Sequence, residues 1–349
     1  MTTTTGVATP RSAAELSTLL GQRPGRVRLV GSGSRQARLP APPMALHMAL
    51  DGIAAIERLD AADRTCSVDC GVRREVLDAE LDARGLELPC PGGGTLGGLF
   101  ASDPIGAASP GGPCPRSLLL GIEAVLADGT RFRSGARVVK NVAGFDVHKL
   151  LVGSAGRLFA ATRLHLRLAP APRASQWFER RGIDHDEALT LLAALRARAV
   201  PPDRVQCERT PDGAFVVRGR FAGRASFVAA SLREHGLTAG AAAWCDHLQP
   251  PTNGEVVAGM ATLGSLPGLL ALLPPGSPFL WHGGGRCEIT MPDAAATDVL
   301  LAAMTAHRLH GHLVHAVPER RGLGTPVPPA HRRLDEGLRN ALDPHGILV

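Results

Sequence analysis

The stretch VVKNVAGFDVHKLLVGSAGRL, residues 138–158, contains both lysines of the chain, Lys140 and Lys149. The other basic side chains among the 38 Lys and Arg residues are arginines. An ammonium group is a compact, strongly hydrated point charge, whereas a guanidinium group is a planar fork, so the two are not equivalent where geometry matters. Two lysines beside a Gly-Ser-Ala-Gly turn therefore indicate a site that uses ammonium groups. The simpler alternative is that both lysines lie on a solvated surface by chance.

The composition sets limits on the class of protein. A chain of 349 residues with 44% hydrophobic residues can form two domains of ordinary size or one large one. Aromatic residues make up 3% of the chain and Tyr is absent, which argues against stacking platforms for single-stranded nucleic acid. The net charge of +6 fits an anionic ligand or partner. The arginines are scattered along the sequence, so we expect no nucleic-acid partner.

Targeting signals are not evident in the sequence. No run of 18 or more apolar residues is present, so we predict no membrane span and expect membrane association only through partners. The first twelve residues, MTTTTGVATPRS, lack the basic and apolar regions of a secretory signal. The seven cysteines are odd in number and contain no Cys-x-x-Cys pair, which favours reduced thiols and a cytoplasmic location.

Hydrophobic periodicity predicts a mixed fold in two parts. In the first part, the patterns predict helices at 73–84 and 145–152 and strands at 26–30, 65–72, 118–126 and 160–168. The Ala-Pro-Ala-Pro run at 169–172 is the best linker in the chain. In the second part, the patterns predict helices at 186–199, 225–235 and 294–309 and strands at 214–221, 279–281, 286–291 and 312–317. A closing helix is expected at 329–342.

Three glycine-rich turns, at 31–34, 92–98 and 153–156, lie beside predicted strands or helices. Glycine allows backbone N–H groups to approach a ligand, and successive N–H groups form anion-binding nests. One such loop is usually only a turn, but three of them could hold a long ligand that carries a diphosphate. Residues 31–36 lack the third glycine of the dinucleotide fingerprint, and no Gly-Lys-Ser or Gly-Lys-Thr follows any of the loops. Two common nucleotide motifs are therefore excluded.

Two segments carry a specific resemblance. PGGGTLGGLFAS at 91–102 and GIEAVLADGTRFRSGARVVKNVAGFDVHKLLVGSAGRL at 121–158 resemble the FAD-binding PCMH-type domain of flavoproteins related to vanillyl-alcohol oxidase. The most similar group is the FAD-binding subunit family of bacterial glycolate oxidase, the GlcE type. The Lys-Asn-Val-Ala-Gly block is the strongest part of the match, and LDPHGIL at 342–348 resembles the closing segment of that family. The resemblance covers 26–172 well and the rest only in general layout.

The resemblance implies an α+β fold. Residues 1–172 would form a two-subdomain FAD-binding PCMH-type domain, residues 173–330 a smaller α+β cap domain, and residues 331–349 a segment that returns to the first domain. The covalent attachment used by some relatives needs a His in the first glycine loop, and Ser34 and its neighbours offer none, so FAD would be non-covalent. The cofactor-binding residues implied are Gly31, Ser32, Gly33, Ser34, Pro91, Gly92, Gly93, Gly94, Thr95, Gly97, Gly98, Lys140, Asn141, Gly144, Gly153, Ser154 and Gly156.

The chain departs from the family pattern at several positions. Arg157 and Phe159 replace a small residue and a glycine after the Gly-Ser-x-Gly turn, and Phe145 replaces a tyrosine. The loop at 106–117 lacks the Arg-Arg-Pro-Trp run of the family. A bulky Phe159 side chain where backbone normally approaches the cofactor favours a second hypothesis, in which the protein has weakened or lost FAD binding.

Single polar residues leave alternatives open. Lys140 could stabilise the reduced flavin by its charge, or it could form a structural salt bridge with Asp128 or Asp146. Asn141 could hydrogen-bond the flavin edge or stabilise a turn. Asp146 is better explained as a helix cap or as a partner of Lys149 than as a base.

Histidines are plentiful near the C-terminus but do not form a metal-site pattern. His312 and His315 would point to opposite faces of a strand, so His307, His310 and these two do not predict a metal site. His282 is a candidate for substrate contact or a surface turn residue. No catalytic residue is evident from the sequence alone.

The leading functional hypothesis follows from the resemblance. The chain would be the FAD-binding subunit of a glycolate-oxidase-like 2-hydroxy-acid dehydrogenase, with hydride transfer from the substrate to FAD. Because the cysteine spacing forms no cluster motif, electrons would pass to a partner iron–sulfur subunit, alongside a paralogous FAD-dependent catalytic subunit. The alternative is a non-catalytic assembly subunit that kept the fold. A third hypothesis is a stand-alone FAD oxidase that uses oxygen.

Overall fold

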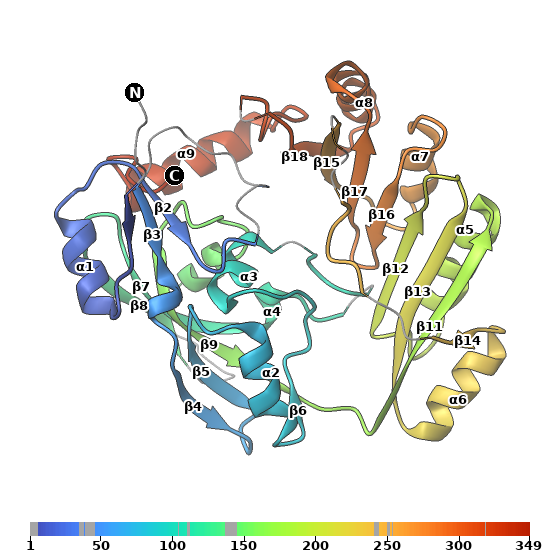
Figure 1. Cartoon of the computed structure of the whole chain (residues 1–349), viewed down its shortest axis with the longest axis horizontal. Helices are drawn as coiled ribbons and strands as arrows, with labels where there is room; N and C mark the ends of the chain where they lie inside the picture. The colour runs from blue at the N-terminus through green and yellow to red at the C-terminus, as the bar shows by residue number, and fades with distance from the viewer. Residues whose placement is uncertain are drawn as a thin grey trace.

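The computed structural model describes residues 6–34, 38, 46–103, 105–109, 112–136, 145–240, 244–249, 252, 254–317 and 319–349. These residues form two α+β bodies that face each other (Figure 1). We refer to residues 6–172 as the N-terminal half and to residues 174–317 as the cap. The α+β fold predicted from the sequence is therefore confirmed.

A small parallel sheet forms one end of the N-terminal half. Its strands are β1 (Val7–Ala8), β3 (Leu46–Ala49) and β2 (Val27–Val30), in that order. Helix α1 (Ala13–Gly21) starts at Ser12, whose hydroxyl accepts a hydrogen bond from the Glu15 amide at 3.1 Å. The last residues of the chain extend this sheet, because the Val27 N–H donates to Ile347 O at 2.7 Å and the Val349 N–H donates to Val27 O at 3.0 Å. The C-terminal residues thus extend the sheet at its β2 edge, and β1 lies at the opposite edge.

A five-stranded antiparallel sheet forms the rest of the N-terminal half. Its strands, in sheet order, are β4 (Ile56–Asp60), β5 (Thr65–Asp69), β9 (Ala160–Arg167), β7 (Leu119–Val125) and β8 (Arg131–Gly135). Alternate residues of these strands pack in one buried cluster with residues of α2 (Arg74–Asp82) and α3 (Leu96–Ser102). The shorter elements are η2 (Leu50–Gly52), β6 (Leu86–Glu87), α4 (Pro115–Leu118) and η3 (Val147–Leu151).

Two segments of the N-terminal half differ in detail from the sequence prediction. The helix predicted at 145–152 is the short 3-10 helix η3, because the His148 amide donates to the Ser134 hydroxyl at 3.1 Å and not to a helical carbonyl. The linker predicted at 169–172 contains strand β10 (Ala169–Pro170), which pairs with β6. The connection to the cap is therefore held against the N-terminal half.

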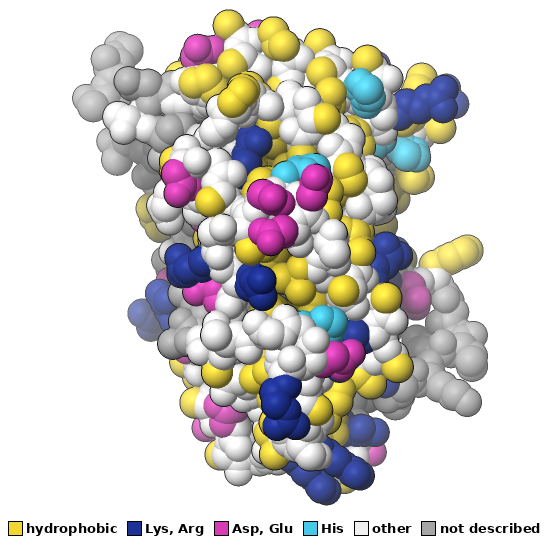
Figure 2. All heavy atoms as spheres, turned by 90° about the vertical axis from the view of Figure 1, so that its right-hand side faces the viewer, with side chains coloured by type: hydrophobic (Ala, Val, Ile, Leu, Met, Phe, Trp, Pro, Cys, Tyr) yellow, Lys and Arg dark blue, Asp and Glu magenta, His cyan; other side chains and the backbone are white. Residues whose placement is uncertain are grey.

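The cap is built on one eight-stranded sheet. Its strands, in sheet order, are β14 (Thr238–Ala239), β11 (Ala174–Ile183), β13 (Phe215–Gly223), β12 (Arg204–Arg209), β16 (Phe279–His282), β17 (Arg286–Met291), β15 (Glu255–Met260) and β18 (His310–His315). Helices α5 (His185–Arg196), α6 (Ala225–Glu234), α7 (Leu266–Ala271) and α8 (Ala294–Ala306) pack in one buried cluster with this sheet and cover its outer face (Figure 1). Figure 2 shows this side of the molecule, where acidic and basic side chains are interspersed.

The two faces of the cap sheet differ in polarity. In β17, Cys287 and Ile289 join the apolar cluster under the helices, so Arg286 and Glu288 lie on the opposite face. In β12, Cys207 packs with the helices and Gln206 lies on the polar face. This polar face is turned toward the N-terminal half (Figure 1). Its charged side chains are available to a site between the two bodies.

Direct contacts join the two bodies. The Gly284 N–H donates to Ala107 O at 3.1 Å, and the Val205 N–H donates to Ala108 O at 2.9 Å. A Cβ at Gly284 would overlap Ala107 O, so only glycine permits this approach. Helix α9 (Pro329–Leu342) then returns to the N-terminal half and packs Leu342 on its core. In the described part of the chain, no helix is both long and apolar enough to cross a membrane.

Candidate functional site

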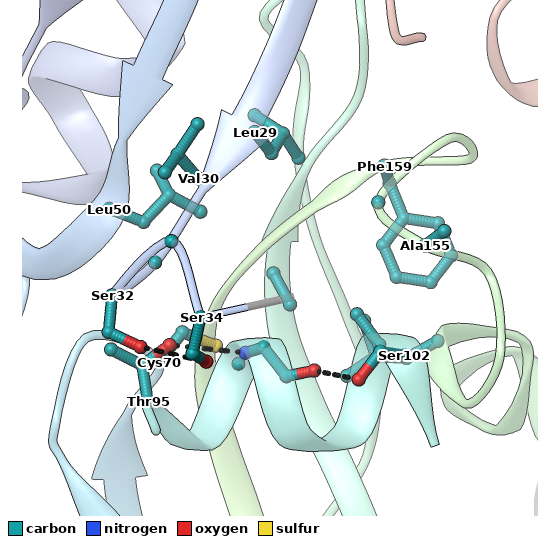
Figure 3. Close-up of a pocket in the computed structure, with 18 residues that line it drawn as sticks. Leu29, Val30, Ser32, Ser34, Leu50, Cys70, Thr95, Ser102, Ala155 and Phe159 are labelled. Atoms are coloured by element: carbon teal, nitrogen blue, oxygen red, sulfur yellow. Dashed lines mark hydrogen bonds between the residues drawn. The ribbon is translucent and has the colours of Figure 1, made fainter. Parts of the chain in front are cut away.

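A groove lined by five glycines runs along α3 in the N-terminal half (Figure 3). We call it the glycine groove. Its empty volume, which includes space open to the solvent, is about 720 Å³. Figure 3 shows Ser32 and Ser34 on the turn after β2, with Leu50 on one side and Phe159 on the other. The residues that line the groove are Leu29, Val30, Gly31, Ser32, Gly33, Ser34, Leu50, Cys70, Thr95, Gly97, Gly98, Ala101, Ser102, Leu151, Ala155, Gly156, Phe159 and Ala161.

The turn after β2 depends on its glycines. A Cβ at Gly31 would overlap the Thr95 hydroxyl, which itself accepts a hydrogen bond from the Gly98 amide at 3.3 Å. Gly33 has a φ of +74°, and a Cβ there would meet no protein atom within 4 Å. The first glycine is needed for packing against α3, whereas the second leaves space beside the groove. A ligand can therefore approach the backbone amides of this turn closely.

The floor of the groove is apolar and chemically inert. A Cβ at Gly97 would lie 2.8 Å from Cys70 Cβ, so α3 and the end of β5 are in close contact. Cys70 is 2% exposed, and its burial raises the pKa of the thiol well above the usual range. The Cys70 side chain is therefore a neutral part of the wall and not a nucleophile.

Phe159 forms a wall of the groove. Its side chain is 1% exposed and belongs to the buried cluster of the N-terminal half. Its ring stacks edge-to-face on Phe132, with 5.3 Å between ring centroids and an angle of 88°. The bulky residue that departs from the family pattern is thus anchored in the core, and the groove beside it stays open.

A second space lies between the N-terminal half and the cap, and we call it the interdomain cavity. Its empty volume is about 1150 Å³. It shares Ser102 and Ala155 with the glycine groove, so the two spaces adjoin at these residues. The residues that line the cavity are Arg38, Ser102, Gly153, Ala155, Arg157, His247, Ala258, Arg286, Glu288, His312, Leu313, Val314 and Gly322.

Glu288 is the buried anion of the interdomain cavity. It is 6% exposed, and its carboxylate contacts Arg38 at 2.6 Å and His247 Nδ1 at 2.8 Å and accepts a hydrogen bond from the Leu248 amide at 2.8 Å. Burial alone would raise the pKa of Glu288, but His247, Arg38 and the Leu248 amide together hold that pKa below its ordinary value. The carboxylate therefore stays ionised.

Two arginines bring positive charge to the same cavity. The Nε atom of Arg157 is buried and makes no hydrogen bond, and no ion pair to Arg157 is found among the residues that the structure describes. Burial lowers the pKa of Arg157, which remains far above neutrality for a guanidinium. Arg286 contacts Asp103 only at 3.6 Å. Both guanidinium groups can therefore take up a ligand carboxylate.

The cap histidines have separate roles. His247 and His312 line the cavity, and burial lowers the pKa of His312, which favours its neutral form. His282 lies beside Gln206 and stacks on Trp244 at 5.4 Å, and burial lowers the pKa of His282 to about 4. His282 is thus a core residue next to the cavity and does not line it. Within the described ranges, no group of three or more His, Cys, Asp or Glu side chains is placed to hold a metal ion.

The predicted cofactor residues fall into three groups. Gly31, Ser32, Gly33, Ser34, Thr95, Gly97, Gly98 and Gly156 line the glycine groove, and Gly153 lines the interdomain cavity. Pro91, Gly92, Gly93, Gly94 and Ser154 line neither space. Gly94 O accepts a hydrogen bond from the Arg74 amide at 2.8 Å, and the Ser154 hydroxyl accepts one from the Gly156 amide at 3.2 Å. Lys140, Asn141 and Gly144 lie outside the described residues.

Lys149 has a structural environment. Its Nζ atom donates to the carbonyl oxygens of Arg116 at 2.8 Å and Leu119 at 2.5 Å, where α4 ends and β7 begins. Burial lowers the pKa of Lys149, an effect that the nearby Asp146 carboxylate opposes. The second of the two lysines therefore joins chain segments and does not face the groove.

The sequence analysis missed several residues of the interdomain cavity, namely Arg38, Ser102, Ala155, His247 and Glu288. They come from separate segments of the chain, and no sequence spacing relates them. The one usable signal is polar alternation in a strand, because Arg286 and Glu288 are two residues apart within an otherwise buried strand.

Comparison with known proteins finds a family match for the N-terminal part of the chain. A family model described as "FAD binding domain" matches residues 4–135. This region is therefore similar to an FAD binding domain. The predicted flavin cofactor and the resemblance to FAD-binding PCMH-type proteins are therefore confirmed. The glycine groove is lined by residues 29–102 of the matched region and by residues 151–161, which follow it.

Curated relatives of the N-terminal part of the chain include a glycolate oxidase subunit and a D-lactate dehydrogenase. The chain is 32% identical over 151 residues to glycolate oxidase subunit GlcE of Escherichia coli, covering 42% of this chain and 43% of that protein. It is 35% identical over 118 residues to a D-lactate dehydrogenase of Archaeoglobus fulgidus, covering 33% of this chain and 27% of that one. The matches thus span less than half the length of these relatives.

The fold extends beyond the region of sequence similarity. The solved structure of an alkyldihydroxyacetonephosphate synthase superimposes with a TM-score of 0.66 at 13% sequence identity, covering 98% of this chain and 76% of that one. This agreement includes the cap, so nearly the whole chain shares the fold of that protein.

Proposed function

We propose that this protein is the FAD-binding subunit of a glycolate-oxidase-like 2-hydroxy-acid dehydrogenase. The observation that carries the proposal is that the glycine groove adjoins a charged interdomain cavity at Ser102 and Ala155. An elongated cofactor with an anionic middle and a flat redox end matches such a space. The relatives that share the FAD binding domain, glycolate oxidase subunit GlcE and D-lactate dehydrogenase, are named for 2-hydroxy acids.

The residues of the groove fit a diphosphate-containing cofactor. The amides of residues 31–34 would hold the diphosphate, because Gly33 leaves open space beside its Cα atom. Gly153 has a φ of +82°, and a Cβ there would meet no protein atom within 4 Å, so it offers the same kind of opening in the interdomain cavity. FAD, when bound, accepts a hydride. The residues of the groove bind it, and those of the cavity bind the substrate.

The interdomain cavity supports a small anionic substrate. Arg157, which forms no ion pair among the described residues, would bind its carboxylate, and Arg286, which pairs with Asp103 at 3.6 Å, would add positive charge beside it. Arg38 and His247 are instead engaged by Glu288. The cap sheet forms one wall of the cavity, and burial of Glu288 in that wall strengthens charge interactions there.

Electrons would leave through other subunits. The described cysteines of this chain are free and largely buried, and they form no cluster of ligands. A partner iron–sulfur subunit and a paralogous FAD-dependent catalytic subunit would complete a cytoplasmic heteromeric complex. The rival hypothesis, an assembly subunit that has lost FAD, rests on Phe159 and on the altered loop at 106–117. The Phe159 ring is packed into the core beside an open groove.

An absorption spectrum of the purified chain tests the proposal. We expect flavin bands that disappear on anaerobic addition of a 2-hydroxy acid such as glycolate or D-lactate. The experiment is done with the chain alone and with any proteins that co-purify with it. A folded, colourless protein that does not take up added FAD would contradict the proposal, and so would a flavoprotein that no 2-hydroxy acid reduces in either preparation.

A further inference from the structure

Three neighbouring strands of the cap sheet contribute to one wall of the interdomain cavity. They are β17, β15 and β18, in that order in the sheet. Val257, Ile289 and Leu313 belong to the apolar cluster under the helices, so the residues next to them in sequence point to the opposite face. That face is turned toward the N-terminal half (Figure 1). The side chains of this wall therefore come from alternate residues of the strands.

Ala258 occupies the middle of this wall. The strand register places it opposite Glu288 on β17 and opposite His312 on β18, so the three residues form one row across the sheet. All three residues line the interdomain cavity. Residues that are directly opposite in antiparallel strands have Cβ atoms about 4.5–5.5 Å apart. The methyl group of Ala258 thus lies between two much larger side chains.

The neighbours of Ala258 along its own strand are larger as well. Val256 and Met260 lie on either side of it in β15 and share its face of the sheet. A methyl group among four larger side chains leaves a recess in the wall. Because Ala258 itself lines the cavity, the described residues of the N-terminal half do not fill this recess. The recess therefore opens into the cavity.

The recess favours an aliphatic group. Its floor is the Ala258 methyl group, and Val314 of β18 also lines the cavity. The Glu288 carboxylate beside the recess is engaged within the protein, by Arg38 at 2.6 Å and by the Leu248 amide at 2.8 Å. A polar group in the recess would lose water without gaining this carboxylate as a partner, whereas an aliphatic group would bury apolar surface.

The recess adjoins a group that attracts carboxylates. Arg286 lies on the same face of β17 as Glu288 and is a diagonal neighbour of Ala258, a position in which Cβ atoms are about 7–8 Å apart. A carboxylic acid whose carboxylate lies near Arg286 can therefore direct the substituent on its α-carbon toward Ala258. Glycolate has no such substituent and would leave the recess empty.

We propose that Ala258 determines substrate specificity, because it makes room for an aliphatic side chain on the α-carbon of the substrate. The substrate class is then 2-hydroxy acids with a short aliphatic chain, such as 2-hydroxypentanoate, in preference to glycolate. The proposal rests on the function proposed above and narrows its substrate class. Ala258 takes no part in the chemical step.

Binding of two inert carboxylates tests the recess without turnover. Acetate and pentanoate differ only in chain length, and neither carries a hydroxyl group that FAD could oxidise. Their dissociation constants are measured by calorimetry on the protein saturated with FAD and again on the FAD-free protein. Burial of one CH₂ group strengthens binding by about fourfold, so burial of about two such groups should make pentanoate bind about 15-fold more tightly than acetate.

Three variants connect this preference to the recess. Ala258→Leu fills the recess with protein atoms, so the preference for pentanoate over acetate should fall to about one while the affinity for acetate changes by less than about threefold. Ala258→Val is a smaller change to a residue that suits a strand, so it should fold if Ala258→Leu does not, and it should give an intermediate preference. Ala302→Leu, at an exposed position of α8, is the matched control and should bind both carboxylates as the wild type does.

The outcomes separate the recess from the function on which it rests. Equal affinity of the wild type for acetate and pentanoate, or a preference that Ala258→Leu and Ala258→Val both retain in full, overturns the role of Ala258. An equal loss of affinity for both carboxylates in Ala258→Leu also overturns it, because a filled recess should exclude only the longer chain. Flavin reduction tests the function separately: 2-hydroxypentanoate should reduce the flavin faster than glycolate at equal, low concentration, and the reverse order overturns the proposed preference. A protein whose flavin no 2-hydroxy acid reduces overturns the proposed function, whatever the binding preference is.

Discussion

Filling the space beside Gly33 should weaken cofactor binding strongly and destabilise the fold no more than the same change at Gly25. Gly33 has a φ of +74° and no protein atom within 4 Å of a Cβ position, and Gly25 has a φ of +89° and equally open surroundings. Gly33 lines the glycine groove and Gly25 does not. A leucine at either position bears the same left-handed backbone strain of roughly 1–2 kcal/mol. Only the leucine at 33 enters the groove.

The expected loss of affinity follows from the contacts that the leucine would block. If the diphosphate loses two charge-assisted hydrogen bonds to the amides of residues 31–34, at about 1.5–3 kcal/mol each, FAD binding weakens by about 10²- to 10⁴-fold. Fluorescence titration of the FAD-free protein gives the affinity, and thermal unfolding gives the stability of each variant. Normal FAD affinity in Gly33→Leu, or an equal loss in Gly25→Leu, would refute the placement of the cofactor.

Three other predictions follow from the described contacts. Arg157→Met should weaken binding of both glycolate and acetate by about tenfold or more in calorimetry, whereas Arg173→Met, at an exposed position, should not. Equal affinities in the wild type and the two variants would count against a carboxylate site at Arg157. The lowered pKa of Glu288 means that its stabilising contribution is present above the ordinary Glu value of about 4.3 and is lost as the pH falls through the lowered folded-state pKa. The free energy of unfolding, measured by denaturant titration, should therefore fall more steeply with acid in the wild type than in Glu288→Gln, and identical pH dependence of the two proteins would contradict this. Gly97→Ala should destabilise the fold by about 1–3 kcal/mol because its Cβ would lie 2.8 Å from Cys70 Cβ, whereas Gly337→Ala, in α9 with open surroundings, should stabilise it by roughly 0.5–1 kcal/mol. Urea unfolding measures both changes, and an unchanged stability of Gly97→Ala would show that α3 and β5 can separate at low cost.

The sequence was informative where local chemistry decides the structure. A short apolar run followed by Gly31 and Gly33 predicted a strand and a turn, and the structure places that turn at the groove. The strict alternation at 160–168 predicted β9. These features depend on strand periodicity and on the conformational freedom of glycine, both of which are local properties.

The interdomain cavity could not be predicted in the same way. Glu288, His247, Arg38 and Arg157 meet only because the cap sheet turns its polar face toward the N-terminal half. The sequence marked Arg157 as a departure from the family but could not show that its guanidinium lacks an ion-pair partner among the described residues. The scarcity of lysine did not mark Lys149 as a ligand-binding residue either, because its ammonium group donates hydrogen bonds to the Arg116 and Leu119 carbonyl oxygens.

The most direct test of the account is a crystal structure of the protein with bound FAD. The account predicts the diphosphate on the amides of residues 31–34 and the flavin ring in the space between Gly153 and the cap, within reach of Arg157 and His247. An FAD molecule bound elsewhere on the chain, or a groove that stays closed to FAD at saturating concentration, would contradict it.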